Sequence, residues 1–465
     1  MCFTGNRYQS EISVQLGDFR ESETMRTSKI LSLKELEQKI NDVDTLQIFT
    51  TDLNGRSVTL QVNPGDTESF FKKGVGFDGS SVPGYGTVDN SDKLLIPLAE
   101  TFRRVPFAQE NLGFLIGKIN EEYGERSLLD PRALLERVVQ QAEDEFGVRF
   151  MTAPEHEFFL LTGDEFSKDI HTDNAGYFHT DPRDKGESVK KDIVAVLKRC
   201  GIQFEKMHYE VTPSQHEINL SCLDPLSTAD RTVLFSYITK RVAHEKDLHA
   251  TFMPKPFNGF NRNALHIHIS AQDLEGNHLF YKPNESDNLS EIARFFIGGI
   301  IKYARETSII MAASFNSYKA YVIGKEAPIV RGWGLKNRSS MVRVPYAEGA
   351  KDTRIEIRSP DPSGNIYLQI ATLIGMGLQG IREKIDCGTP DKGNLYNTES
   401  AAHLMDTNFL PRNMFEALVE AENSSFLKNF LGDPLYCQYM ALKTAEWENY
   451  RTFVTPREHK MNFHI

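Results

Sequence analysis

Hydrophobic residues recur along this chain with two periods, one of which predicts helices. Apolar residues return every three to four positions in LKELEQKI and in DPRALLERVVQQAEDEFG, where Asp130–Pro131 supplies a start signal. The same period recurs in ESVKKDIVAVLKRC, ADRTVLFSYITKRVAHEK, SEIARFFIGGIIKYARET and the tail from Pro411. These segments are expected to be amphipathic helices, with Trp447 and Tyr450 packing the tail against the body.

The other period is two and predicts strands. LQIFTTDLNGRSVTLQV is expected to form two strands around an Asn54–Gly55 turn. Further strands are predicted in LLIPLAE, FLIGKI, FMTAPEHEFFLL, IQFEKMHYEV, HEINLS, ATFMP, ALHIHIS and RIEIRS. The glycine-rich segment from Gly74 to Thr87 is expected to be a loop. Many hairpins separated by helices indicate an α+β protein with a large, mainly antiparallel sheet and helices outside it.

The length of 465 residues predicts more than one domain. We expect a polar extension over 1–28, a small mixed domain over 29–125 and a larger domain over 127–465.

Composition narrows the class of protein. A formal net charge of −11 and scattered basic residues argue against nucleic acid and anionic membrane as partners. No apolar run reaches the roughly 20 residues of a membrane span. The five cysteines lack CxxC spacing, and the N-terminus lacks a basic region followed by an apolar core. We therefore expect a cytoplasmic protein.

Three predicted strands carry charged residues in pairs separated by one position. Glu155 and Glu157 flank His156, His266 and His268 flank Ile267, and Glu356 and Arg358 flank Ile357. Both members of a pair project from one side of a sheet. Each pair alone has an ordinary explanation: a solvated face, core histidines or a strand-end ion pair. Acids among Phe158, Phe159 and Met151, however, require compensation by cations.

A predicted hairpin adds two acids. Glu210 ends one strand of MHYEVTPSQHEINL and Glu217 lies on the returning strand. Five glutamates and one or two histidines without a thiolate favour Mg²⁺ or Mn²⁺, two or more per site. Such ions facing Arg338, Arg343, Arg354 and Arg358 indicate a bound phosphate. We predict an enzyme that acts on a phosphate-bearing ligand.

Blocks of the sequence resemble a known family. The matching blocks are FDGSSVPGY, APEHEFFLL, GYFHTDPRD, HYEVTPSQHEI, FMPKPFNGFNRNALHIHIS, NSYKAYVIGKEAP, WGLKNRSSMVRVP and RIEIRSPDP. In this order, over nearly the whole chain from about Leu46, they resemble the class I glutamine synthetases of bacteria and archaea.

The resemblance implies a fold and an assembly. An N-terminal β-grasp domain would precede a glutamine-synthetase/guanido-kinase-like catalytic domain with a curved antiparallel sheet. The homo-oligomer would be a dodecamer, with active sites between subunits.

The resemblance also implies roles for individual residues. One metal would be held by Glu157, Glu210 and Glu217, the other by Glu155, His266 and Glu356. ATP, the co-substrate, would be bound by Glu205, His268, Ser270, Arg343, Lys351 and Arg354. Arg338 and Arg358 would serve phosphoryl transfer, and Glu326 would close a flap over the intermediate. Asp78 and Ser81 of the adjacent subunit would join Tyr177 and Glu210 around ammonia, with Asp78 taking its proton.

The implied reaction is the ATP-dependent joining of a small-molecule acid and ammonia or an amine. The substrate carboxylate would attack the γ-phosphate, and the amine would then displace phosphate from the acyl phosphate. Glutamate with ammonia, a reaction of nitrogen metabolism, is favoured. A γ-glutamyl-amine ligase and a ligase for another acid remain alternatives, and a non-catalytic structural or regulatory member is an alternative of another class.

Five positions depart from the family pattern, among them Ile366 in place of a proline and Leu98 in place of an aspartate. Ala320 replaces the arginine that grips the α-carboxylate of glutamate, and Arg262, which follows Asn261, replaces a glycine that lies against glutamate. We hypothesise that Arg262 compensates for Ala320; the alternative is that Arg262 points to solvent. Ser214 replaces a glycine in the hairpin turn. Tyr396, in a region that is adenylylated in some relatives, is not expected to be modified.

Overall fold

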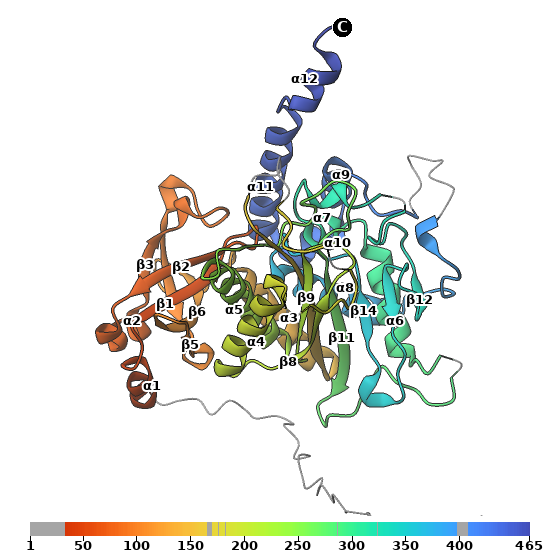
Figure 1. The fold of residues 1–465 in the computed structure, drawn as a ribbon. Coiled ribbons are helices and arrows are strands. Elements are labelled where there is room, and N and C mark those ends of the chain that lie inside the picture. Colours follow the sequence, from red (N-terminus) through yellow and green to blue (C-terminus); the bar gives the residue numbers. More distant parts are fainter. Residues whose placement is uncertain are drawn as a thin grey trace, which may run out of the picture.

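The computed structural model describes residues 33–164, 170–174, 176–181, 183–285, 287–322, 324–397 and 408–465, and Figure 1 shows their arrangement. The extension expected over 1–28 lies outside the described residues. Both domains named by the sequence are present, each built around its own sheet. The exact domain boundaries stay a prediction.

The N-terminal domain is a β-grasp sheet with two helices. Its strands are β1 (Thr45–Thr51), β2 (Ser57–Val62), β3 (Val75–Asp78), β4 (Asp92–Pro97), β5 (Arg103–Pro106) and β6 (Asn111–Glu121). The order is β2-β1-β6-β4-β3, with β5 beside β6, and only the β1–β6 pair is parallel. Helices α1 (Leu33–Ile40) and α2 (Thr67–Lys73) complete the domain.

The glycine-rich segment is not all loop, which corrects the sequence prediction. Residues Val75–Asp78 form β3 and pair antiparallel with β4. Val75 and Phe77 alternate with Gly76 and pack against the core, so the period of two was present but hidden by the surrounding glycines.

The catalytic domain is built on a second, larger sheet. Its strands are β7 (Val148–Leu161), β8 (Phe204–Tyr209), β9 (Gln215–Leu220), β10 (His249–Thr251), β11 (Leu265–Asp273), β12 (Trp333–Leu335), β13 (Val342–Val344) and β14 (Ile355–Ile357). The order is β12-β13-β14-β11-β7-β9-β8, with β10 beside β7. All pairs except β12–β13 are antiparallel. The predicted antiparallel sheet is confirmed.

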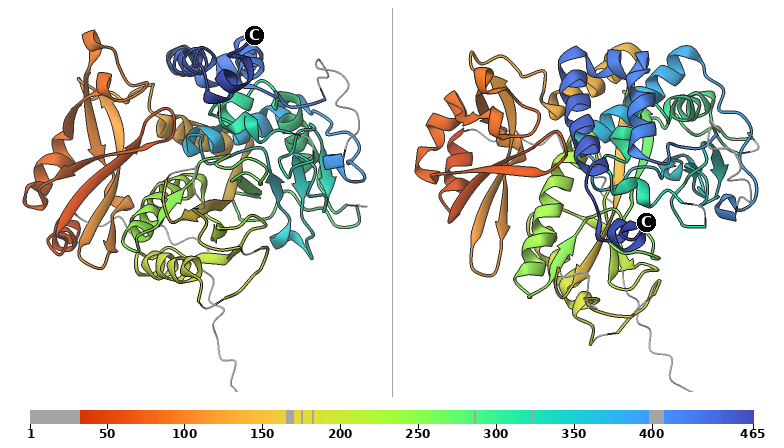
Figure 2. Two further views of the ribbon diagram at one scale, coloured as in Figure 1. Left: turned by 45° about the horizontal axis from the view of Figure 1, so that its top comes forward. Right: turned by 90° about the horizontal axis from the view of Figure 1, so that it is seen from above.

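Helices cover the outside of this sheet (Figure 2). They are α3 (Pro131–Phe146), α4 (Lys185–Arg199), α5 (Pro225–His244), α6 (Glu291–Tyr303), α7 (Ser308–Met311), α8 (Ile366–Glu383), α9 (Met414–Glu422), α10 (Ser425–Leu431), α11 (Asp433–Arg451) and α12 (Pro456–Asn462). Except for α11, the longer ones start where a side chain accepts a hydrogen bond from a free backbone N–H. These caps are Asp130, Asp184, Asp224, Ser290 and Asn365.

Helix α8 was not predicted from the sequence. Nearly all of its residues are buried, because it packs between α3, α5 and α6. The apolar run IYLQIATLIGMG at its start has few polar residues, and such a run cannot be told from a buried strand by its period alone.

The two domains are joined at the start of α8. The side-chain amide of Asn365 donates to the Thr51 hydroxyl at 2.9 Å and to the Asp52 carbonyl at 2.8 Å. Its carbonyl oxygen accepts from the N–H groups of Tyr367 and Leu368. One side chain thus caps α8 and holds the β1–β2 hairpin.

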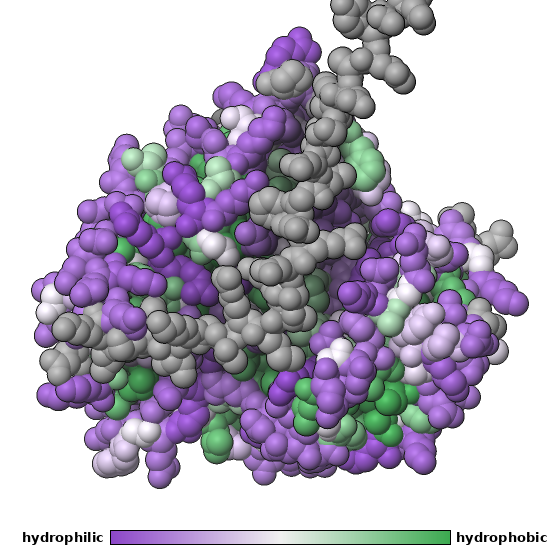
Figure 3. Space-filling model, turned by 90° about the horizontal axis from the view of Figure 1, so that it is seen from below, coloured by the Kyte–Doolittle hydropathy of each residue, from purple (hydrophilic) through white to green (hydrophobic). Residues whose placement is uncertain are grey.

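Helix α11 packs on the body through Leu435, Tyr439 and Lys443, and α12 extends away from it (Figure 1). As expected, Trp447 and Tyr450 pack on the body, where both stack on Phe315. The face opposite these helices is largely hydrophilic (Figure 3). Within the described part of the chain, no helix combines the length and hydrophobicity needed to cross a membrane.

Candidate functional site

Strand register gathers the predicted acids and histidines on one face of the catalytic sheet. On β7, Glu155 lies opposite His266 of β11, and Glu157 lies opposite Glu217 of β9. On the far side of β11, His268 lies opposite Glu356 of β14. Residues scattered over 200 positions are therefore neighbours.

The first cluster consists of Glu155, His266 and Glu356. One potential ligand atom from each lies within 4.8 Å of the others. His266 Nδ1 is 2.9 Å from Glu155 and 3.7 Å from Glu356, while His268 Nε2 is 3.0 Å from Glu155. Burial by itself would raise the pKa of Glu155, but hydrogen bonds from both histidines outweigh it and hold that pKa well below its usual range.

The second cluster consists of His208, Glu210 and Glu217, again with ligand atoms within 4.8 Å of one another. His208 lies 3.2 Å from Glu217 and 3.5 Å from Glu210. Burial and the charge of Glu217 raise the pKa of Glu210 to about 8. Burial and the charges of Glu210 and Glu217 raise the pKa of Glu157, which is 7% exposed.

These acids have the properties of a divalent-cation site. Glu157, Glu210 and Glu217 repel one another, and His208 together with Lys206, 3.9 Å from Glu217, cannot neutralise three carboxylates. An all-oxygen and imidazole donor set suits Mg²⁺ or Mn²⁺. The residues present therefore fit two metal ions, one at each cluster.

Arginines border the first cluster. Arg343 and Arg358 both donate to Glu356, at 2.5 and 2.8 Å. Burial alone would raise the pKa of Glu356, but the charges of Arg358, His268 and His266 together outweigh it and lower that pKa to about 2. Arg343 was expected on the nucleotide side; in this chain it binds a carboxylate of the metal cluster.

The other predicted ATP residues lie near the same end of the sheet. Arg354 Nε lies 3.2 Å from His268 Nδ1, which connects these two residues directly. Ser270 follows on β11, Glu205 is exposed on β8, and Lys351 is exposed in the 3-10 turn η6 (Ala350–Asp352). Glu205 and Arg354 both act electrostatically on Cys222, so both lie near that thiol.

The predicted flap residue contacts the predicted acid pocket. Asn261 donates from its amide to the Glu326 carboxylate at 2.9 Å. Tyr396 donates to the Arg338 carbonyl at 2.5 Å and to the Glu326 carbonyl at 3.2 Å, and accepts from Arg358 at 3.4 Å. Tyr396 therefore bridges three residues of the site.

An aromatic pair covers the second cluster. Tyr177 and Phe178 are stacked with 4.1 Å between ring centroids, and each meets the His208 ring edge-on. Phe178 adopts φ = 59°, a conformation that costs free energy for a bulky residue. The predicted amine-site residue Tyr177 thus lies beside the metal cluster.

Asp78 and Ser81 are not part of this cluster within one chain. They lie at the exposed end of β3 in the N-terminal domain, where Ser80 and Ser81 donate to Asp78 and lower its pKa. No contact between described residues joins them to either cluster.

Arg262 does not point to solvent, so that alternative was wrong. It is 5% exposed, and its guanidinium donates to the Arg358 carbonyl at 2.6 Å and the Ser359 carbonyl at 3.3 Å. Its charge lies 5.5 Å from the ring centroid of Tyr321, the neighbour of the buried Ala320. Whether Arg262 binds substrate stays a prediction.

Sequence reasoning missed His208, Gln215 and the structural role of Tyr396. His208 precedes Glu210 by two positions, the same spacing that identified the other pairs, and could have been found. Gln215 donates to Glu157 at 3.0 Å and to the Arg262 carbonyl at 2.7 Å, which connects metal cluster and acid pocket. No local pattern marks such a contact.

Comparison with known proteins agrees with this geometry. The glutamine synthetase β-grasp domain matches residues 42–122, and the glutamine synthetase catalytic domain matches residues 128–462. Glutamine synthetase of Methanosarcina mazei is 36% identical over 427 residues, covering 90% of this chain and 94% of that protein. Glutamine synthetase of Thermotoga maritima is 34% identical over 431 residues, covering 92% and 97%.

Solved structures give the same result. A structure described as apo GmaS without ligand superposes with a TM-score of 0.83 at 27% identity, covering 93% of this chain and 100% of that chain. Plasmodium falciparum glutamine synthetase superposes with a TM-score of 0.82 at 23% identity, a likeness of fold. With both domain models matched and relatives above 30% identity along most of its length, the chain belongs to the glutamine synthetase family and is a ligase.

Proposed function

We propose that this ligase forms an amide from L-glutamate and ammonia, using ATP and an acyl-phosphate intermediate. The observation that carries the proposal is the pair of acid–histidine clusters on one sheet face, bordered by Arg343 and Arg358. Divalent ions held there would neutralise the phosphates of ATP. A purely structural protein would have no use for several buried acids that repel one another.

The chain's own residues would divide the remaining work. Arg338 and Arg358 would orient the phosphoryl group, since planar guanidinium groups match phosphate oxygens. Glu326, held by Asn261, would shield the intermediate from water. Asp78 of a neighbouring subunit would accept the proton of ammonium. We propose a dodecamer, because Asp78 and Ser81 reach no cluster within their own chain.

A second candidate is a ligase with another acid or an amine substrate. It is favoured by one observation: the buried Arg262 forms no ion pair with a described carboxylate and lies beside Tyr321, next to Ala320. The buried guanidinium also interacts electrostatically with Asp361 and Glu157, and its remaining N–H groups would donate to a substrate carboxylate. The likeness to GmaS is compatible with a related ligase.

The test is a phosphate-release screen with Mg²⁺-ATP. Several carboxylic acids would be crossed with ammonia and several primary amines. Release with glutamate and ammonia above all other pairs supports the first candidate. Preference for another acid or amine supports the second, and no release with any pair contradicts both.

Arg262→Ala tests the acid pocket. We expect KM for the acid to rise about tenfold or more, the effect of losing a charged hydrogen bond, with KM for ATP unchanged. Arg262→Lys keeps the charge and serves as the matched control. An unchanged KM for the acid in Arg262→Ala would show that Arg262 only supports the backbone.

A further inference from the structure

The loop that carries Arg338 is held by one neighbouring segment, residues 393–396. Asn337 and Ser339, on either side of Arg338, both hydrogen-bond to that segment, at 3.0 and 2.9 Å. The Arg338 carbonyl accepts from the Tyr396 hydroxyl at 2.5 Å. The exposed guanidinium of Arg338 forms no hydrogen bond or ion pair with a described residue. Its direction therefore depends on the backbone from which it projects, and this segment fixes that backbone.

Tyr396 also holds the backbone of the Glu326 segment, residues 324–326. The Tyr396 carbonyl accepts the Gly324 N–H at 2.9 Å, and the Tyr396 hydroxyl lies 3.2 Å from the Glu326 carbonyl. Among the described residues, no other hydrogen bond reaches the backbone of residues 324–326. The bond from Asn261 to Glu326 involves only the Glu326 side chain. The hydroxyl proton of Tyr396 thus faces two carbonyl oxygens, one on each of two site segments.

The same hydroxyl reaches the first metal cluster through Arg358. One Nη of Arg358 donates to Tyr396 at 3.4 Å, while the other donates to Glu356 at 2.8 Å. Arg338 and Arg358, the two arginines expected at the phosphoryl group, therefore meet at a single hydroxyl. Arg338 contacts it through its carbonyl and Arg358 through its guanidinium.

We infer that Tyr396 is a positioning residue for phosphoryl transfer, which keeps the Glu326 segment closed while it holds Arg338 and Arg358 toward the same phosphate. This inference rests on the proposed ATP-dependent reaction. If the Glu326 segment opens early, water adds to the phosphorus of the acyl phosphate and the bond to the acyl oxygen breaks. The free acid and phosphate then leave without an amide. Tyr396 acts through its three neighbours rather than on the substrate.

The first test is amide hydrogen exchange of residues 324–327 in the full-length oligomer, without substrates. Tyr396→Phe removes the hydroxyl but keeps the ring and the carbonyl that accepts the Gly324 N–H. We expect exchange at least about threefold faster than in the wild type, because one of two backbone anchors is lost.

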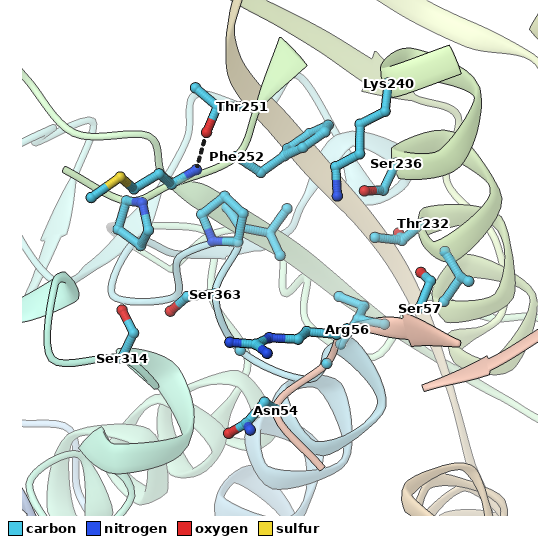
Figure 4. A pocket seen from close by; sticks show the side chains of 18 of the residues that line it. Asn54, Arg56, Ser57, Thr232, Ser236, Lys240, Thr251, Phe252, Ser314 and Ser363 are labelled. Atoms are coloured by element: carbon cyan, nitrogen blue, oxygen red, sulfur yellow. Dashed lines mark hydrogen bonds between the residues drawn. The ribbon is translucent and has the colours of Figure 1, made fainter. Parts of the chain in front are cut away.

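Two control variants remove a hydroxyl elsewhere. Tyr436→Phe is the matched control, because its hydroxyl also donates to a backbone carbonyl, that of Ala421 at 3.2 Å, outside the site. Ser236→Ala removes a hydroxyl from a cavity of about 990 Å³ behind the catalytic sheet. Figure 4 shows Ser236 on the wall of this space, which His156 of β7 also lines. We expect both controls to exchange residues 324–327 at the wild-type rate.

The second test is the ratio of phosphate released to amide formed, at saturating Mg²⁺-ATP, acid and amine. We expect a ratio of about one in the wild type and both controls, and of about two or more in Tyr396→Phe. For Tyr396→Phe, kcat for amide formation should fall about tenfold, with KM for the acid changed by less than about twofold. A purely structural role would lower activity at a constant ratio.

The inference and the proposed function fail in different ways. If glutamate and ammonia give no amide in the wild type, the proposed function fails, and the exchange measurement, which needs no substrate, still decides the role of Tyr396. Exchange in Tyr396→Phe equal to that in the wild type and the controls would overturn the inference. A ratio that stays at one in Tyr396→Phe would overturn it as well.

Discussion

His208 is the residue whose role follows most directly from the structure rather than from the sequence. It contacts two acids of the second cluster and lies under the aromatic pair Tyr177–Phe178. A residue in this position orients the metal-binding carboxylates or binds the metal itself.

His208→Ala should therefore raise the Mg²⁺ concentration needed for half-maximal activity by roughly tenfold or more. The measurement is phosphate release against Mg²⁺ at saturating ATP. His244→Ala, an exposed histidine at the end of α5, is the control. An unchanged Mg²⁺ requirement would exclude His208 from the cluster.

Ser214 shows how one substitution within a family changes the local balance of forces. Its φ of 66° lies in the left-handed region, which costs a residue with a side chain about 1 kcal/mol. Its buried hydroxyl accepts the backbone N–H of Thr172 at 2.7 Å, and its own N–H donates to Asp173. The hydrogen bonds offset the strain.

Two substitutions separate these contributions. Both Ser214→Ala and Ser214→Gly leave the Thr172 N–H without its partner, but only glycine relieves the strain. We expect Ser214→Ala to be less stable than Ser214→Gly by about 1 kcal/mol, measured as the urea midpoint of unfolding. A serine-to-alanine variant as stable as the glycine variant would show that the turn carries no strain.

At the scale of elements, the catalytic sheet brings together carboxylates whose ionisation has opposite effects on the stability of the fold. Glu155 and Glu356 have lowered pKa values, so they stabilise the fold above their unfolded pKa and lose this contribution only as the pH falls through their folded values. Glu157 and Glu210 have raised pKa values, and the stability lost on their ionisation grows as the pH rises from about 4.5 toward about 8.

The sheet should therefore be less stable at pH 8 than at pH 6.5 when divalent ions are removed. In this window His156, whose pKa burial lowers to about 3, is neutral in the folded chain but half protonated in the unfolded chain at pH 6.5, so it opposes the fall by less than about 0.5 kcal/mol. We expect Tm in EDTA to fall by on the order of 2 °C or more across the window. Excess Mg²⁺ should abolish the fall, and an equal fall with and without Mg²⁺ would contradict the metal assignment.

Elements differed in how far the sequence could predict them. Helices with one polar face and strands with a period of two were recognised, and the strand register then placed Glu155, His266 and Glu356 together as expected. The sequence did not reveal helix α8, because nearly all of its residues are buried. It did not reveal β3, because glycines surround that strand. The partners of Arg262 and Tyr396 are backbone carbonyls distant in sequence, which no local pattern encodes.

At the scale of the whole molecule, the position of Asp78 leads to a prediction about how the subunits assemble. It lies in the N-terminal domain, exposed and without contact to either metal cluster of its own chain. If subunits share active sites, two different inactive chains can restore each other.

Asp78→Asn and Glu356→Gln should each abolish most activity as pure oligomers. Reassembled in a 1:1 mixture, they should recover about a quarter of wild-type activity. In a random assembly, about one shared site in four combines an intact Asp78 with an intact Glu356. The control mixes Glu356→Gln with Glu155→Gln, two defects of one cluster, and should recover none. A first mixture as inactive as its components would place the role of Asp78 within its own chain.

The Asn365 side chain has a consequence for motion in this enzyme. It caps α8 with one oxygen and holds the β1–β2 hairpin with its amide nitrogen, so the domains cannot swing apart without fraying a helix at the centre of the molecule. A change in the relative orientation of the domains would therefore require part of the catalytic core to unfold locally. We expect opening and closing during turnover to be local, confined to surface segments such as the one that carries Glu326, while the two domains of a chain keep their relative orientation.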